Sequence, residues 1–170
     1  EEGRLRYLRL DKNENVIGLP ARAVREVLSR LPSETVSAYH ETAPFYRLLA
    51  RSLRLPEECL HVTMGSDGAI KSVFEAYVRR RDEVVFPHPT YAMYYVYAEM
   101  FGARARKIPY DADLSLGVER LLDAIGPKTS LVAVANPNSP TGTVFSEGDL
   151  VRILARARKF GALVLVDEAY

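Results

Sequence analysis

Two apolar runs in this sequence each end in a cluster of polar residues. Residues 130–135 lead into NPNSPTG (136–142), and residues 162–166 lead into DEAY (167–170). Unbroken runs of Val, Leu and Ala of this length are typical of parallel strands that are buried on both faces of a sheet. In open α/β sheets, ligands bind just beyond the carboxyl ends of such strands. The two polar clusters therefore predict one site at one edge of a parallel sheet.

Helix-type and strand-type patterns alternate along the rest of the chain. Apolar residues recur at helical spacing in six segments: 20–31, 44–53, 67–78, 91–100, 118–125 and 147–160. Short runs typical of strands fall at 83–86, 104–108, 130–135 and 162–166. This order predicts an α/β fold, a three-layer α/β/α arrangement with a mainly parallel sheet and right-handed crossovers.

The first residues lack predicted strands. We therefore assign residues 1–36 to an N-terminal arm with a small-domain helix, and residues 37–170 to the N-terminal part of a large ligand-binding domain. The sequence lacks an initiator Met and stops directly after a strand. We expect this large domain to be incomplete and the chain to be a piece of a longer protein.

Composition excludes several classes of protein. The chain has 23 Lys and Arg against 22 Asp and Glu, a net charge of +1, and no basic block, so we expect no nucleic-acid partner. Cys59 is the single cysteine, which excludes an internal disulfide or a cysteine-based zinc site. The apolar runs are shorter than the roughly 20 residues of a spanning helix, and no signal peptide is visible. We expect a cytoplasmic protein without a membrane partner.

A turn of small residues, TMGSDG (63–68), precedes a predicted helix. The free amides and the positive dipole end of a helix N-terminus favour an anion such as a phosphate group. The same pattern also fits an ordinary helix N-cap. The sequence contains neither G-x-G-x-x-G nor G-x-x-x-x-G-K-[ST], which argues against dinucleotide sites and P-loop nucleotide sites.

Five segments together carry a resemblance to a known family. DKNEN (11–15), GSD (65–67), PTY (89–91), NPNSPTG (136–142) and DEAY (167–170) occur in the order and approximate spacing of the fold type I pyridoxal-phosphate (PLP) enzymes. Within that group the chain most resembles the histidinol-phosphate aminotransferase branch of the class I/II aminotransferases. The resemblance implies the large domain of the PLP-dependent transferase fold. It also implies transfer of an amino group between an amino acid and a 2-oxo or phosphorylated keto acceptor.

The resemblance implies roles for the residues in these motifs. PLP accepts electrons from the substrate's α-carbon, and does so best when its pyridine nitrogen is protonated. Asp167 holds the family position of the carboxylate that faces this nitrogen, Tyr91 that of the aromatic ring that stacks on the pyridine, and Tyr170 that of the phenol that bonds the cofactor's 3-oxygen. The turn that binds the cofactor phosphate corresponds to Ser66, Asp67 and Gly68.

Other positions have less specific assignments. Tyr39 matches a tyrosine that reaches the cofactor phosphate of the neighbouring subunit, which implies a homodimer with a composite active site. Asn13 and Asn15 match the substrate entrance, although an N-terminal polar turn fits them equally well. Glu168 should point away from Asp167 on an extended strand, and we assign it no role in cofactor binding. Three further aromatic residues are interpreted as helix packing: Tyr94, Tyr95 and Tyr97.

One position departs from the commonest family pattern. The asparagine that precedes proline in Asn-Pro-Thr-Gly bonds the cofactor's 3-oxygen, and here this place holds Ser139, with Asn138 one residue earlier. A hydroxyl can donate the same bond over a shorter reach. Either Ser139 substitutes directly or Asn138 turns inward.

The resemblance places the Schiff-base lysine after the aspartate motif, so we expect it downstream of Tyr170, together with the arginine that holds the substrate carboxylate. All five lysines of the chain precede Asp167: Lys12, Lys71, Lys107, Lys128 and Lys159. We therefore expect no catalytic residue within this chain. Two alternatives to an aminotransferase stay open: a PLP-dependent amino-acid-phosphate decarboxylase with the same cofactor contacts, and a lysine-less relative that acts as a binding module.

Overall fold

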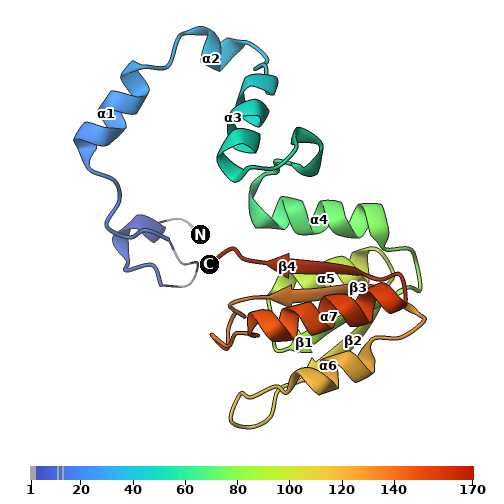
Figure 1. The fold of residues 1–170 in the computed structure, drawn as a ribbon. Coiled ribbons are helices and arrows are strands. Elements are labelled where there is room, and N and C mark those ends of the chain that lie inside the picture. Colours follow the sequence, from blue (N-terminus) through green and yellow to red (C-terminus); the bar gives the residue numbers. More distant parts are fainter. Residues whose placement is uncertain (1–2, 11, 13) are drawn as a thin grey trace. The chain divides into compact units, whose positions relative to one another are not determined.

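The structure is a computed structural model that describes residues 3–10, 12 and 14–170. It divides into two compact units, Glu1–Leu60 and His61–Tyr170 (Figure 1). The boundary that we predict after residue 36 lies inside the first unit and stays a prediction. Within the described residues, no helix is long and apolar enough to cross a membrane.

The second unit is built on a parallel sheet of four strands, in the order β2-β1-β3-β4. The strands are β1 (Glu83–His88), β2 (Arg104–Pro109), β3 (Thr129–Ala135) and β4 (Leu163–Asp167). Each lies where the sequence predicts a strand. The mainly parallel α/β fold is therefore confirmed.

Helices cover both faces of this sheet (Figure 1). One face packs against α4 (Gly65–Tyr77) and α5 (Ala92–Met100), and the other packs against α6 (Val118–Ala124) and α7 (Glu147–Lys159). Each helix lies in a segment with helical spacing of apolar residues. The three-layer α/β/α architecture is confirmed for this unit.

The alternation of side chains along β1 explains its apolar sequence. Val84 and Phe86 face α4 and α5, whereas Val85 faces α6 and α7, and all three side chains are fully buried. Residues of β3 alternate between the two faces in the same way. Burial of a side chain of this size contributes about 1.5–3 kcal/mol. A strand with helices on both faces therefore needs an unbroken apolar run rather than an alternating one.

The edge strand β2 is mostly exposed, and its sequence is accordingly less apolar than that of β1. Of its residues, only Ile108 is buried, and Arg104, Arg106 and Lys107 are exposed. Charged residues on an edge strand discourage pairing with other chains. This explains why the apolar pattern of residues 104–108 is weak.

The first unit contains short helical elements: η1 (Arg4–Arg6), α1 (Ala21–Ser29), α2 (Glu34–Ser37), α3 (Ala43–Leu53) and η2 (Glu57–Cys59). The helices predicted at 20–31 and 44–53 are present as α1 and α3. In the described part of this unit Ala50 is the only residue of a helix that is buried. The apolar side chains of Val27 and Leu28 on α1 are about 60% exposed (61% and 60%).

Candidate functional site

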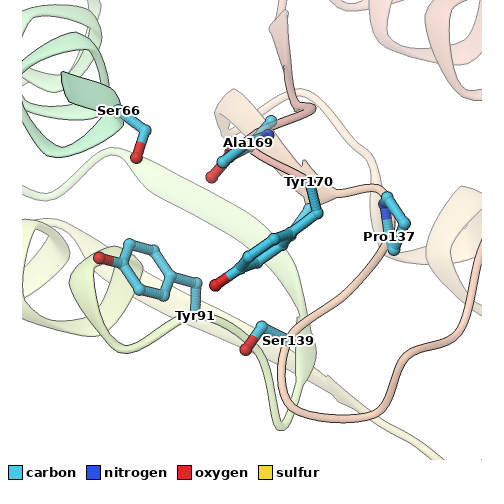
Figure 2. Close-up of a pocket in the computed structure, with 8 residues that line it drawn as sticks. Ser66, Tyr91, Pro137, Ser139, Ala169 and Tyr170 are labelled. Carbon is cyan, nitrogen blue, oxygen red and sulfur yellow. Dashed lines mark hydrogen bonds between the residues drawn. The ribbon is translucent and has the colours of Figure 1, made fainter. Parts of the chain in front are cut away.

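A pocket lies at the carboxyl ends of the strands of the second unit (Figure 2). It encloses about 360 Å³, including its open mouth. Its lining comes from the start of α4, the residue before α5, the last residues of β3 and β4, and the segments that follow these two strands: Ser66, Tyr91, Ala135, Pro137, Ser139, Asp167, Ala169 and Tyr170. The two polar clusters of the sequence do meet at one edge of a parallel sheet.

Asp167 is the last residue of β4, and its half-buried carboxylate lines this pocket. The Tyr94 hydroxyl donates to Asp167 Oδ2 over 3.0 Å, and the amide of Ala169 donates to Oδ1 over 3.1 Å. The Asp167 carbonyl also accepts a hydrogen bond of 2.9 Å from the amide of Asn136. The segments after β3 and β4 are thereby joined next to the carboxylate.

Tyr91 contributes an aromatic ring to the pocket wall. Its hydroxyl donates to Asp67 Oδ1 over 2.8 Å, which fixes the ring beside the first turn of α4. The hydrogen bond to this carboxylate and partial burial raise the pKa of Tyr91 to about 12. In Figure 2 the hydroxyl end of Tyr170 points toward the side of the pocket where Tyr91 and Ser139 lie.

The turn before α4 brings backbone amides to the same pocket. Gly65 begins the helix with a left-handed φ of 71°, and Ser66, the next residue, lines the pocket. A Cβ on Gly68 would lie 3.1 Å from the Cβ of Thr63, so a larger residue here would have to displace the Thr63 side chain. The N-cap residue, Met64, makes no side-chain cap hydrogen bond within the described structure. The Gly65 amide donates to the Thr63 carbonyl over 2.9 Å, and the amides that follow it in the first turn are available to an anion.

Asn138 and Ser139 occupy different environments. The side chain of Asn138 is buried; its Oδ1 accepts from the Thr90 hydroxyl over 2.6 Å, and its Nδ2 donates to the Pro89 carbonyl and the Thr141 hydroxyl. Ser139 lines the pocket, whereas Asn138 is not part of the lining. Of the two alternatives that the sequence leaves open, the geometry therefore brings Ser139 to the pocket.

We expect Asn138→Ala to reduce the free energy of unfolding by about 1–3 kcal/mol, because it leaves the buried Thr90 hydroxyl and the Pro89 carbonyl without their partner. Urea unfolding of the ligand-free protein measures this change. Ser139→Ala is the matched control, and it should change the stability by less than about 0.5 kcal/mol. Equal stabilities of the two variants would contradict the structural role of Asn138.

Sequence reasoning missed the polar role of Tyr94. This residue of α5 packs in the core as predicted, with no exposed surface, but its hydroxyl also bonds Asp167. Burial, together with the negative charge of Asp167, raises the pKa of the Tyr94 phenol, so it stays a donor. A buried tyrosine usually has a partner for its hydroxyl, which is the signal that could have indicated such a contact. His88 is exposed and contacts the Tyr95 hydroxyl at 2.7 Å.

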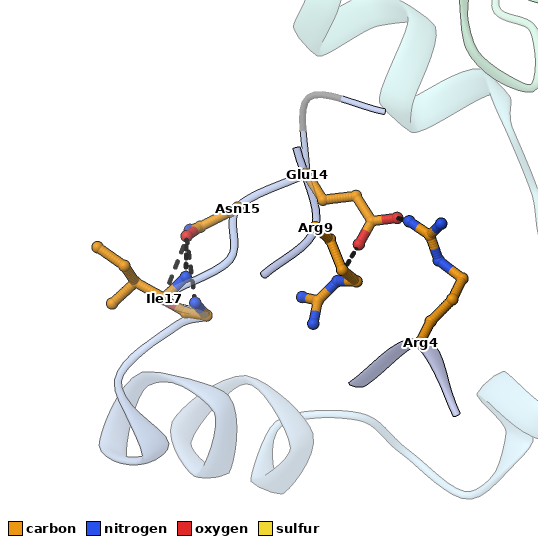
Figure 3. Close-up of polar contacts among 6 residues, drawn as sticks. Arg4, Arg9, Glu14, Asn15 and Ile17 are labelled. Atoms are coloured by element: carbon orange, nitrogen blue, oxygen red, sulfur yellow. Dashed lines mark hydrogen bonds and ion pairs between the residues drawn. The ribbon is translucent and has the colours of Figure 1, made fainter. Parts of the chain in front are cut away.

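The predicted substrate residues lie in the first unit. Asn13 is outside the described residues. Asn15 forms a polar turn in which its Oδ1 accepts from the amides of Ile17 and Gly18, each over 3.1 Å (Figure 3). The neighbouring Glu14 carboxylate pairs with Arg9 and Arg4, and these hydrogen bonds lower the pKa of Glu14.

Tyr39, the residue that we assign to the partner subunit's cofactor, is fully exposed in the single chain. Its predicted role therefore needs a surface outside this chain, and stays a prediction.

Comparison with known proteins assigns a family. The model of the family "Aminotransferase class I and II" matches residues 7–170. The histidinol-phosphate aminotransferase of Caldanaerobacter subterraneus subsp. tengcongensis is 36% identical over 165 residues, which cover 95% of this chain and 46% of that protein. The histidinol-phosphate aminotransferase of Symbiobacterium thermophilum is also 36% identical, over 96% of this chain and 45% of that protein.

Solved structures of aminotransferases are similar to this chain in fold. Histidinol-phosphate aminotransferase from Sinorhizobium meliloti, in complex with pyridoxal-5'-phosphate, has a TM-score of 0.76 at 23% identity, over 92% of this chain and 42% of that chain. N-Succinyldiaminopimelate aminotransferase from Mycobacterium tuberculosis has a TM-score of 0.73 at 26% identity, over 88% and 41%. The chain spans less than half the length of these relatives. It belongs to the class I and II aminotransferase family.

Proposed function

We propose that the protein containing this chain is a PLP-dependent aminotransferase that moves an amino group between an amino acid and a 2-oxo or phosphorylated keto acceptor. The observation that carries the proposal is the composition of the pocket wall. A carboxylate from β4, an aromatic ring and the start of a 13-residue helix border one space of about 360 Å³. Relatives named histidinol-phosphate aminotransferase support a phosphorylated substrate, which is the amino compound in one direction of the reaction and the keto compound in the other.

The chemistry of these groups fits PLP. Asp167 would accept a hydrogen bond from the protonated pyridine nitrogen, and the Tyr91 ring would lie against the face of the pyridine. The amides of the first turn of α4, from Ser66 onward, would bind the phosphate, with the helix dipole in the favourable direction. Ser139 and Tyr170 line the pocket with hydroxyl groups, which suit the 3-oxygen of the cofactor.

The chain's own residues would then orient and polarise the cofactor. When bound, PLP supplies an electron sink for the α-carbon of the substrate. Asp167 would keep the proton on the ring nitrogen, where a fixed negative charge in a half-buried site favours the cation. The Asp67 carboxylate already accepts the Tyr91 hydroxyl, so amides rather than the Asp67 side chain would contact the phosphate.

The proposal includes a cytoplasmic homodimer in which Tyr39 reaches the cofactor phosphate of the partner subunit. The full exposure of Tyr39 in the single chain supports a contact outside it. The apolar residues exposed on α1 also favour a covered surface in an assembly.

Activity of the intact protein tests this proposal. Purified protein supplied with PLP, histidinol phosphate and a 2-oxo acid should release the corresponding keto product together with the amino acid made from the acceptor. Release of carbon dioxide from an amino-acid phosphate without amino transfer would indicate the decarboxylase instead. Tight PLP binding without either reaction would indicate a binding module.

Borohydride reduction of the PLP-loaded intact protein should attach the cofactor to one lysine that follows Tyr170. All five lysines of this chain are among the described residues, and none of them lines the pocket. Peptide mass mapping after reduction identifies the modified lysine. Stoichiometric modification of one of the lysines within this chain would contradict the proposal that the Schiff-base lysine follows Tyr170. These lysines are Lys12, Lys71, Lys107, Lys128 and Lys159.

A further inference from the structure

The carboxylate of Asp167 is held from two directions. Tyr94 donates its hydroxyl to Oδ2 over 3.0 Å, and the amide of Ala169 donates to Oδ1 over 3.1 Å. An ionised carboxylate offers about four acceptor positions, two on each oxygen. Both oxygens are thus tethered, and each keeps acceptor capacity for a group in the pocket that Asp167 lines.

Tyr94 is itself rigidly placed. Its side chain has no exposed surface, and its ring lies 6.1 Å from the Phe86 ring and 6.2 Å from the Tyr91 ring, centroid to centroid. The contact with Tyr91 is edge to face, with an interplanar angle of 89°. Core packing therefore fixes the direction from which the hydroxyl reaches Asp167.

The Tyr94 phenol is held in its protonated form. Burial and the adjacent charge of Asp167 raise the pKa of its phenol above the ordinary value of 10.0. A phenol that stays protonated at neutral pH can only act as a donor to the carboxylate.

We propose that Tyr94 is a positioning residue, which holds the Asp167 carboxylate in the orientation that keeps a cofactor's ring nitrogen protonated. This inference rests on the proposed function. The core-packed ring of Tyr94 sets the angle of the carboxylate, and Ala169 prevents its rotation. Without the hydroxyl, Oδ2 turns toward water and the hydrogen bond to the ring nitrogen weakens.

Tyr94→Phe tests this arrangement, because it keeps the ring and removes one oxygen atom. In the intact protein loaded with PLP we expect kcat to fall roughly tenfold, the effect of one hydrogen bond to a charged group. KM should change by less than about twofold, because Tyr94 does not line the pocket and the change falls on the chemical step.

A spectroscopic measurement separates positioning from a general structural effect. With PLP labelled by ¹⁵N in the ring, the nitrogen signal of the parent protein should stay at the protonated position as the pH rises from about 6 to 9. In Tyr94→Phe the signal should move toward the neutral position within that range. Tyr95→Phe is the matched control on the same helix, since its hydroxyl contacts His88 and the Thr90 amide instead. It should leave the nitrogen signal unchanged.

A double-mutant comparison shows whether Tyr94 acts through Asp167. In the Asp167→Asn background, Tyr94→Phe should lower kcat by less than about twofold. The inference is overturned if Tyr94→Phe leaves both kcat and the nitrogen signal at parent values, or if it lowers kcat equally in both backgrounds. A parent protein that binds no PLP contradicts the proposed function, and this inference falls with it.

Discussion

Asp167→Ala is expected to lower kcat by a factor of about 10²–10³, the usual effect of removing one group that stabilises developing charge. Binding of PLP should weaken far less, because phosphate and ring contacts remain in place. The physical reason is that the carboxylate acts mainly when negative charge flows from the substrate into the ring. Single-turnover kinetics of the intact protein, together with equilibrium dialysis of PLP, measure the two effects separately.

Two further variants make the Asp167 result specific. Glu168→Gln changes the adjacent, exposed carboxylate and should leave kcat within about twofold of the parent. Asp167→Asn keeps an acceptor for the Tyr94 hydroxyl but removes the charge, so it should resemble Asp167→Ala in kcat and the parent in stability. Unchanged turnover in Asp167→Ala would remove Asp167 from the proposed mechanism.

The second large effect is expected at the start of α4, where Ser66→Pro should weaken PLP binding about 10–100-fold. Proline deletes the backbone amide, and the first turn of a helix tolerates this because its amides have no partner within the helix. Ser66→Ala keeps the amide and removes only the exposed hydroxyl, so it should weaken binding less, by about 2–10-fold. Equilibrium dialysis with PLP compares the two variants.

Unfolding of the cofactor-free variants in urea controls for damage to the helix. If Ser66→Pro and Ser66→Ala unfold at similar urea concentrations but differ in PLP affinity, the amide is the binding group. Equal and negligible losses of affinity in both would mean that the turn at residues 63–68 serves only to begin α4.

The sequence predicts the sheet well because the apolar runs in β1, β3 and β4 follow directly from burial between two helical layers. It also predicts that residues after β3 and β4 share a pocket, since the carboxyl ends of parallel strands meet at one edge. The four-residue helix α2 (Glu34–Ser37) was not predicted, because a single turn has no periodicity to detect.

The side-chain network of the site was harder to predict. The contact between Tyr94 and Asp167 joins residues 73 positions apart, and no local pattern encodes it. The choice between Asn138 and Ser139 depends on how the backbone turns after β3, which spacing alone does not determine. The bond between Tyr91 and Asp67 likewise depends on the placement of α4 beside α5.

The buried amide of Asn138 has a consequence for the thermodynamics of binding. It joins the segment after β1, at Pro89 and Thr90, to the segment after β3, at Thr141. Both segments are therefore ordered by the fold before any ligand arrives, and a ligand need not supply the free energy for ordering them. Preorganisation of this kind strengthens affinity by reducing the entropic penalty of association rather than by adding contacts. A residue outside the pocket lining can thus influence how tightly a ligand is held.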